Sequence, residues 1–275
     1  MAIDVVLLGT GNPLPDSNRA GAATLVRAGG RTMLVDAGRA VCMRLAAAGV
    51  IPLMLDDVLL THLHSDHICD LNDVITTHWV MGPMPKSLRV FGPPRTQDVV
   101  AGLRAMLQPD IEYRIAHHAD LTWEPQLDVR EIAPGLVFDE SGVRVIAART
   151  DHRPVEPTVG YRVECDGKAV VLAGDTVPCD GLDELCRGAD IYVQTVLRVD
   201  LVGAAPVQRF RDTIDYHSTV AQAAQTAKRG GVRTLVLTHQ IPTPFAGTAD
   251  EWVALARAHF DGEIVFGEDL VSVAV

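Results

Sequence analysis

The segment from Thr61 to His67 reads Thr-His-Leu-His-Ser-Asp-His, so potential metal ligands occur at the spacing His62-x-His64-x-Asp66-His67. Imidazole nitrogens and carboxylate oxygens are ligands of zinc and of related divalent cations. If the segment forms a loop, neighbouring side chains can point to two different ions. Burying these polar groups together without a cation would be costly. The segment therefore predicts a metal-dependent hydrolase.

One loop does not supply enough ligands for two ions, so distant residues must contribute the others. His152, Asp175 and His239 each stand at the end of an apolar, strand-like segment. The loop itself follows such a segment. Since α/β sheets place their sites at the ends of strands, we expect these residues to converge on one edge.

The elements that must position these residues follow from the hydrophobic pattern. In the first half we expect strands over residues 3–8, 22–26, 31–35, 57–61 and 87–91, and helices over residues 39–48, 66–79 and 96–107. Further strands are expected over residues 126–133, 136–138 and 143–149.

The second half repeats this order of elements. We expect strands over residues 160–165, 169–173, 191–193, 234–237, 263–266 and 270–275, and helices over residues 182–187 and 219–229. Thr248-x-x-Glu251 predicts a capping box at the start of the last helix. Two halves that each contain strands and helices indicate an α/β fold with two sheets packed face to face and helices outside. We expect one domain over residues 1–275.

Composition narrows the class of protein. The chain has 48% hydrophobic, 21% charged and 5% aromatic residues and a net charge of −11, which is typical of a soluble globular protein with an aliphatic core. A strongly acidic chain binds nucleic acid poorly without clustered Lys and Arg.

The scattered cysteines predict free thiols in a reducing compartment. The amino terminus is typical of a strand and not of a signal peptide, and no apolar stretch is long enough for a bilayer, so we expect a cytoplasmic protein without membrane attachment.

The order of these candidate ligands along the chain resembles the metallo-β-lactamase superfamily. The opening Leu-Gly-Thr-Gly-Asn-Pro at residues 8–13 is similar to the ribonuclease Z and arylsulfatase-like branch of that superfamily. The resemblance covers essentially the whole chain. It implies a four-layer αβ/βα sandwich with two divalent metal ions, usually Zn²⁺, although Mn²⁺ or Fe²⁺ suits the same ligands.

The resemblance also implies a role for each residue. One metal ion would be held by His62, His64 and His152, the other by Asp66, His67 and His239, and Asp175 would bridge the two. Asp66 would also orient the attacking hydroxide. Relatives of this kind are commonly homodimers, so we expect a homodimer.

His217 stands in Tyr216-His217-Ser218-Thr219, which resembles a ribonuclease Z motif whose histidine protonates the leaving group. The alternative is a histidine at a helix start with Ser218 as the cap. The remaining histidines, namely His78, His117, His118 and His259, match no motif and are expected on the surface or behind the site. Arg153, Arg198, Arg209 and Arg211 are candidate anion-binding residues, although solvated positions explain most of them.

Three departures from ribonuclease Z favour a small substrate. Asp36 is followed by Ala-Gly-Arg-Ala, as in the arylsulfatase-like members, and residues 153–174 leave no room for a tRNA-gripping arm. Val193-Gln194-Thr195 stands where the family often carries His-Glu. We therefore expect hydrolysis of a small anionic ester, either an aryl sulfate or a phosphodiester. The alternatives are a tRNA 3′-processing endonuclease, with nucleic acid as a less favoured partner, and a non-catalytic metal-binding relative.

Overall fold

The computed structural model describes residues 2–275. The first half contains, in order, β1 (Ile3–Gly9), β2 (Ala23–Ala28), β3 (Arg31–Val35), α1 (Val41–Ala47), η1 (Pro52–Met54), β4 (Asp57–Leu59), α2 (Ser65–Ile68), α3 (Leu71–Val80), β5 (Ser87–Gly92), α4 (Thr96–His117) and β6 (Gln126–Glu131). The second half contains β7 (Gly135–Glu140), β8 (Val143–His152), β9 (Val155–Cys165), β10 (Lys168–Leu172), α5 (Asp180–Cys186), β11 (Ile191–Leu197), α6 (Val199–Val202), α7 (Gln208–Arg211), η2 (Asp212–Asp215), α8 (Val220–Gly230), β12 (Thr234–Ile241), α9 (Ala249–Arg257), β13 (Glu263–Phe266) and β14 (Ser272–Ala274).

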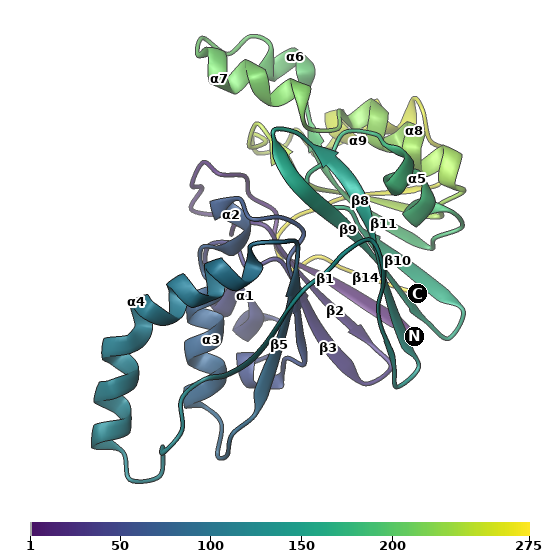
Figure 1. Cartoon of the computed structure of the whole chain (residues 1–275). Helices are drawn as coiled ribbons and strands as arrows, with labels where there is room; N and C mark the ends of the chain where they lie inside the picture. Colours follow the sequence, from purple (N-terminus) through teal and green to yellow (C-terminus); the bar gives the residue numbers. More distant parts are fainter. Residues whose placement is uncertain (1) are drawn as a thin grey trace.

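The strands form two seven-stranded sheets (Figure 1). The order in the first is β14-β1-β2-β3-β4-β5-β6, and in the second it is β13-β12-β11-β10-β9-β8-β7. Both sheets are mixed. In the first, β1, β2 and β3 pair antiparallel, whereas β3, β4, β5 and β6 pair parallel. In the second, β7 to β10 pair antiparallel, whereas β10 to β13 pair parallel. The last strand returns to the first, because β14 pairs with β1 in the register Asp4↔Ala274.

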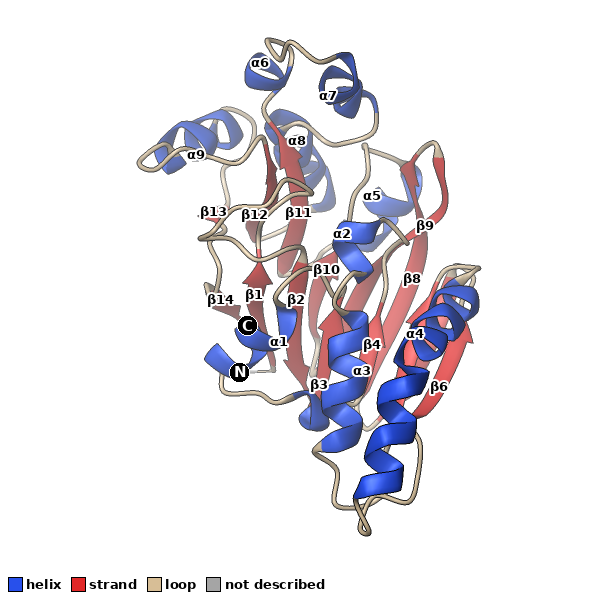
Figure 2. Cartoon of the chain, turned by 90° about the vertical axis from the view of Figure 1, so that its left-hand side faces the viewer, coloured by secondary structure: helices blue, strands red, loops and turns tan. Residues whose placement is uncertain are grey.

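The two sheets face each other across one core and are covered by helices on their outer sides, as predicted (Figures 1 and 2). Alternation along β1 explains this layering, since successive side chains of a strand point to opposite faces. Ile3, Val5 and Leu7 belong to the core between the sheets, whereas Val6 and Leu8 pack under α1 and α3. A second outer core lies between the other sheet and helices α5, α8 and α9.

The helix expected over residues 66–79 is divided into α2 and α3. The break at Cys69 and Asp70 is held by contacts with the loop after β3 that no local pattern encodes. The Asp70 N–H donates to the Ala37 carbonyl at 3.0 Å, the Ala37 N–H donates to the His67 carbonyl at 2.7 Å, and the Asp70 carboxylate accepts from the Ala40 N–H. These bonds fix α2 beside the loop.

Both expectations about helix caps were wrong. Thr219, and not Ser218, caps α8, and it forms a capping box with Gln222. The Ser218 hydroxyl instead donates to the Thr176 carbonyl at 2.7 Å. At the last helix, the Thr248 hydroxyl donates to the Phe245 carbonyl at 2.8 Å, so no capping box forms there.

A segment without predicted elements stands apart from the two sheets. Residues 199–216 contain α6, α7 and η2, and we name them the cover segment because they project over the sheet edge (Figure 1). Elsewhere α4 is longer than expected and reaches His117, with Ile111 buried against Trp79. No helix within residues 2–275 is long and apolar enough to cross a membrane.

Candidate metal centre

The residues predicted as ligands meet at one edge of the two sheets. The loop after β4 carries His62 and His64, and α2 carries Asp66 and His67. The other residues come from the second sheet: His152 ends β8, Asp175 follows β10, and His239 lies in β12. His239 has a φ of 44°, an uncommon backbone conformation for a residue with a side chain, and such residues cluster at functional sites.

One group of side chains comprises His62, His64, His152 and Asp175. Their ligand atoms all lie within 4.8 Å of one another. His64 Nδ1 lies 3.1 Å from His62 Nε2 and 3.2 Å from His152 Nε2. Three imidazoles from two sheets thus point their nitrogens at one position.

The second group comprises Asp66, His67 and His239, whose ligand atoms also lie within 4.8 Å of one another. Asp66 Oδ2 lies 3.1 Å from His239 Nε2 and 3.7 Å from His67 Nε2. The buried Nε2 of His67 has no hydrogen-bond partner among the described residues. A buried nitrogen without a partner is expected where a ligand completes the site.

Asp175 lies between the two groups. Its Oδ2 is 3.5 Å from His67 Nε2, 3.8 Å from both His62 Nε2 and His152 Nε2, and 3.9 Å from His239 Nε2. Burial alone would raise the pKa of this carboxyl, but the charges of His239 and His67 outweigh burial and hold the pKa well below its usual range. The position is that of a carboxylate shared by both groups.

Hydrogen bonds behind the rings determine which nitrogens face the centre with a lone pair. Thr61 Oγ1 donates its proton to the Asp36 carboxylate, so it can only accept from His62. The Nδ1 of His62, 3.0 Å away, must therefore carry a proton and donate it to Thr61 Oγ1. His152 Nδ1 donates to the Tyr216 carbonyl at 2.8 Å. Both neutral rings therefore present an unprotonated Nε2 to His64 Nδ1, which has at most one proton to share. A divalent cation satisfies these lone pairs, so the residues fit a metal ion.

Burial keeps the three histidines of the first group in the neutral form that binds metal, whereas in the second group the charges of nearby carboxylates overcome burial and raise the pKa of His67 and His239. In the first group, burial lowers the pKa of His62 and His64, and it lowers the pKa of His152 to about 4, so these rings are neutral at pH 7. For Asp66, burial alone would raise the pKa, but the hydrogen bond from His239 and the charges of His67 and His239 together outweigh burial and lower the pKa to about 2. Neutral imidazoles and ionised carboxylates are the ligating forms of these side chains.

Asp36 holds one ring of each group, although it was not predicted as a site residue. Its carboxylate accepts from His67 Nδ1 at 2.8 Å and from the Thr61 hydroxyl at 2.8 Å. Through Thr61 it also orients His62. Carboxylates behind metal-binding histidines fix the tautomer and the ring orientation. Asp36 has a φ of 60° where the chain turns after β3, and its side chain reaches His67 directly and His62 through Thr61.

His217 adjoins the centre just before α8. Its Nε2 lies 3.2 Å from Asp175 Oδ2, and its Nδ1 lies 2.9 Å from the Thr213 carbonyl oxygen. Both nitrogens thus face oxygen acceptors, so the ring donates an N–H to at least one of them. Of Val193-Gln194-Thr195, which stands where the family often carries His-Glu, Thr195 reaches the centre: its hydroxyl donates to Asp175 Oδ1 at 2.7 Å.

A cavity of about 470 Å³ opens over the centre. Its floor includes His64, Asp66 and His217. Its walls are mostly apolar and come from the loop after β1, the cover segment and the end of β12: Pro13, Leu14, Leu201, Val202, Phe210 and Ile241. The centre is therefore reached through an apolar opening.

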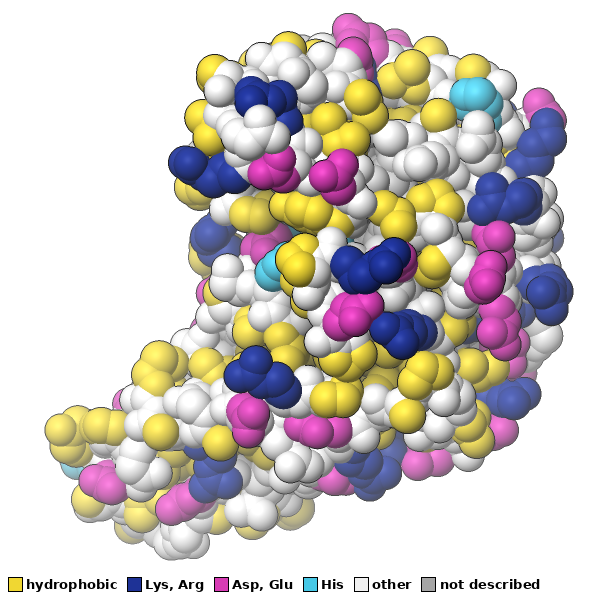
Figure 3. Space-filling model, turned by 45° about the horizontal axis from the view of Figure 1, so that its top comes forward, with side chains coloured by type: hydrophobic (Ala, Val, Ile, Leu, Met, Phe, Trp, Pro, Cys, Tyr) yellow, Lys and Arg dark blue, Asp and Glu magenta, His cyan; other side chains and the backbone are white. Residues whose placement is uncertain are grey.

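Of the predicted anion-binding arginines, only Arg209 lines this cavity. Arg153 and Arg198 are each bound by a nearby carboxylate, and Arg211 by the Ala205 carbonyl. Arg209 forms no ion pair with any residue in the range 2–275, and its guanidinium lies 5.4 Å from the centroid of the Phe210 ring. Figure 3 shows no broad basic surface on the face in view, because Asp and Glu separate the Lys and Arg side chains.

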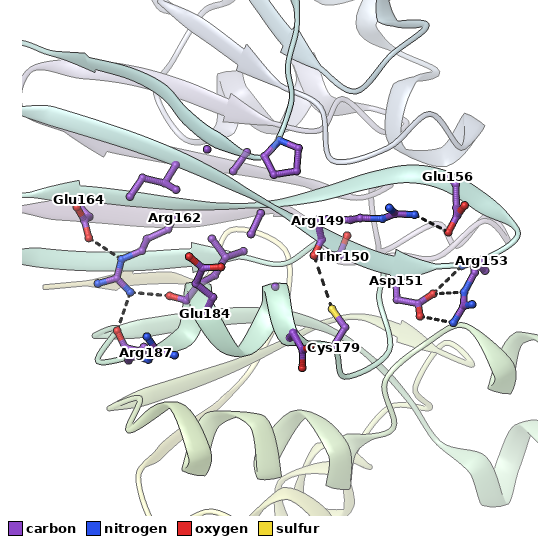
Figure 4. A pocket seen from close by; sticks show the side chains of 18 residues that line it. Arg149, Thr150, Asp151, Arg153, Glu156, Arg162, Glu164, Cys179, Glu184 and Arg187 are labelled. Carbon is purple, nitrogen blue, oxygen red and sulfur yellow. Dashed lines mark hydrogen bonds and ion pairs between the residues drawn. The ribbon is translucent and has the colours of Figure 1, made fainter.

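A larger cavity, of about 910 Å³, lies elsewhere, between strands β8 and β9 and helix α5 (Figure 4). Several of its charged side chains are paired: Arg149 pairs with Glu156 at 3.0 Å, and Arg162 pairs with Glu164 at 2.7 Å. None of the candidate metal ligands lines it. This cavity is a solvated cleft beside α5.

The fold and the site define a class of protein, and the comparisons with known proteins agree with it. A family model for the β-lactamase superfamily domain matches residues 31–240. The chain belongs to the metallo-β-lactamase superfamily, and it is a hydrolase of that fold whose family implies divalent metal ions.

Similar sequences indicate which branch of the superfamily the chain resembles. A protein named ribonuclease Z from Mycobacterium avium (strain 104) is 55% identical over 99% of this chain and 98% of its own length. A ribonuclease Z from Mycobacterium marinum (strain ATCC BAA-535 / M) is 54% identical over 99% of both chains. These similarities support the ribonuclease Z branch of the predicted resemblance.

Solved structures share the fold. The metallo-β-lactamase fold protein YhfI from Bacillus subtilis superposes with a TM-score of 0.76 at 22% identity, covering 98% of each chain. The short form of human tRNase Z superposes with a TM-score of 0.71 at 24% identity, covering 99% of each chain. At these identities the similarity concerns the fold alone, and it confirms the four-layer sandwich.

His78 was expected on the surface or behind the site, and the structure places it in the core. The side chain is buried, and its Nε2 has no hydrogen-bond partner among the described residues. Burial, reinforced by the charge of Lys86, lowers the pKa of His78 to about 4. His78 is a core residue of α3 and not a site residue.

Proposed function

We propose that this protein is a ribonuclease Z-type phosphodiesterase that removes the 3′ extension of precursor tRNA. The observation that carries the proposal is the identity of 52–55% to proteins named ribonuclease Z, over nearly the full length of this chain. The geometry supports a hydrolase, and these relatives favour RNA over the small anionic ester that the sequence departures favoured.

The proposal includes two divalent cations, which the residues that converge on the sheet edge would hold; the histidine-rich ligand set suits Zn²⁺. When bound, such a pair supplies an activated water molecule and neutralises the charge of the phosphodiester. One ion would be held by His62, His64 and His152 and the other by Asp66, His67 and His239, with Asp175 between the two groups available to both.

Two residues act on protons. Asp66, ionised and on the cavity floor, accepts a hydrogen bond from the attacking water and so orients it. The oxygen of water bonds to phosphorus and the water releases one proton to solvent, while the bond from phosphorus to one ribose oxygen breaks. His217, which faces acceptors with both nitrogens and lines the same cavity, gives its proton to the departing ribose oxygen.

The acidic charge of the chain is compatible with an RNA substrate bound locally. A net charge of −11 weakens the summed, non-specific attraction to phosphates, but it does not prevent a few contacts at the cleavage site. A small aryl phosphodiester or aryl sulfate is the second candidate, because the 470 Å³ cavity has largely apolar walls that suit an aryl group.

A cleavage assay separates these candidates. The metal-loaded protein is incubated with precursor tRNA bearing a 3′ trailer, with bis(p-nitrophenyl) phosphate and with p-nitrophenyl sulfate. We expect precursor tRNA to be cut at one position beside the trailer, and the activity to be lost with Asp175→Ala. Asp183→Ala, which removes a surface carboxylate paired with Arg229, is the matched control and should cleave normally.

Other outcomes would replace the proposal. Turnover of the sulfate without cleavage of RNA would identify an arylsulfatase-like enzyme. Bound metal without turnover of any substrate would identify a non-catalytic relative.

The proposal includes a homodimer and a cytoplasmic site of action, because precursor tRNA is a cytoplasmic substrate. Exposed methionines near η1 and the end of α3 offer apolar surface for a second copy: Met54 is 51% exposed, Met81 43% and Met84 66%. Light scattering should give about twice the chain mass of 29.6 kDa. A value equal to one chain would remove the dimer from the proposal.

A further inference from the structure

We propose that Phe210 and Arg209 of α7 form a subsite for one unpaired nucleotide of the RNA, whose base stacks on the Phe210 ring while Arg209 binds its phosphate. The inference rests on the proposed function for the identity of the ligand. It adds which part of the RNA is recognised and which side chains recognise it.

The subsite is continuous with the metal centre. Phe210 and Arg209 line the same cavity as His64, Asp66 and His217. A cavity of about 470 Å³ is within the range of small-molecule sites, so a nucleotide beside the cleaved bond fits it. A group bound against α7 therefore lies next to the reacting phosphate.

The apolar wall indicates what is bound there. Phe210 and Leu201 are each 37% exposed, and Leu14, on the other side of the opening, is 56% exposed. Phosphates and ribose hydroxyls gain nothing from such a surface, because they lose water without finding partners. A nucleobase does gain binding free energy there, since stacking of a base on an aromatic ring is worth roughly 1–3 kcal/mol.

Arg209 supplies the matching charge. It is the only one of the candidate anion-binding arginines that lines the cavity, and it has no carboxylate partner among residues 2–275. Its guanidinium lies 5.4 Å from the centroid of the Phe210 ring, so the cation and the aromatic face belong to one surface. Guanidinium groups bind phosphate through several N–H donors, which places a phosphate beside the stacked base.

The charge of the whole chain favours this mode over contact with a duplex. A protein with a net charge of −11 gains little from a long row of phosphates. A single stacked base with one cation provides affinity where the cut is made, and it requires that nucleotide to be unpaired.

Binding of two small probes tests the subsite. Adenosine 5′-monophosphate and ribose 5-phosphate share the phosphate and ribose and differ in the base. Isothermal titration calorimetry on the metal-loaded protein should show the adenosine compound binding roughly 5- to 150-fold more tightly. Phe210→Ala should abolish this ratio, and Phe210→Trp should keep it. Arg209→Gln should weaken both probes by the same factor.

Phe245→Ala is the matched control, because Phe245 is a more exposed phenylalanine, at 76%, that does not line this cavity. It should leave both affinities unchanged. Equal binding of the two probes by the unmodified protein, or a ratio that survives Phe210→Ala, would overturn the subsite. The binding assay needs no RNA cleavage. Failure to cut precursor tRNA therefore counts against the proposed function, and loss of the base preference counts against the subsite.

Discussion

Replacing Asp36 with Asn tests whether the hydrogen bonds behind the metal centre determine how tightly it holds its ions. The carboxylate accepts from the Thr61 backbone N–H, the Thr61 hydroxyl and His67 Nδ1, each at 2.8 Å. Through the Thr61 hydroxyl it also sets the direction of His62. An amide has the same shape but only one accepting oxygen, so at least one of these donors must lose its partner.

The expected loss follows from the burial of these groups. Asp36 is 5% exposed and His67 is 1% exposed, so water cannot replace the missing acceptor. A buried donor left without a partner costs about 1–3 kcal/mol, and loss of the carboxylate behind a metal-binding histidine typically weakens metal affinity by about 10- to 100-fold. We therefore expect Asp36→Asn to bind metal about 10- to 100-fold more weakly.

Competition with a chromophoric chelator measures the affinity, and circular dichroism checks the fold. Asp56→Asn is the control, because Asp56 also accepts a backbone N–H, from Thr32 at 2.9 Å, but away from the centre. It should keep the metal affinity of the unmodified protein. A folded Asp36→Asn protein whose metal affinity stays within about twofold would refute this reasoning.

Three further predictions follow from the site and the core. His64→Ala should lose bound metal and activity while circular dichroism stays unchanged, because the side chain lies on a loop outside the core; metal analysis of the dialysed protein measures this. His217→Ala should slow turnover without loss of metal, since its nitrogens face Asp175 and a carbonyl; kcat and metal content are measured together. His78→Leu should reduce the decrease in the free energy of unfolding at acid pH. The folded pKa of about 4 lies below the unfolded value of 6.5, so stability present above pH 6.5 is lost as pH falls toward 4, by about 2 kcal/mol at pH 5. Urea unfolding at pH 7 and pH 5 measures the difference.

Each of these predictions has a contradicting result. Full metal retention by His64→Ala would remove that residue from the ligand set. An unchanged kcat for His217→Ala would refute the role of proton donor. An equal loss of stability in acid for His78→Leu and the unmodified protein would show that His78 does not titrate as its burial implies.

The parts of the fold that were predictable are those encoded by local pattern. The apolar run of β1 and the hairpin of β2 and β3 locate the first sheet, and the ends of the apolar runs in the sequence locate His152, Asp175 and His239. The His-x-His-x-Asp-His spacing indicates a metal site without any knowledge of the fold. In each case the signal lies within a few neighbouring residues.

The parts that were not predictable depend on contacts between distant segments. The break between α2 and α3 is held by the Ala37 loop, and the role of Asp36 depends on two rings more than twenty positions further along the chain. The cover segment showed no clear periodicity, yet it builds the cavity wall. For the substrate, the absence of a tRNA-gripping arm and the acidic charge favoured a small ester, whereas the similarity to proteins named ribonuclease Z favours RNA.

The end of the cover segment, which forms a wall of the cavity, also contacts the imidazole rings of His152 and His217. His152 comes from β8 and His217 precedes α8, but the carbonyls of Tyr216 and Thr213 hold their Nδ1 atoms at 2.8 and 2.9 Å. A displacement of this segment large enough to widen the entrance must therefore strain or break both bonds. Admission of a bulky ligand and the alignment of two rings are mechanically linked, and a protease nick near the exposed Gly203 would disturb both at once.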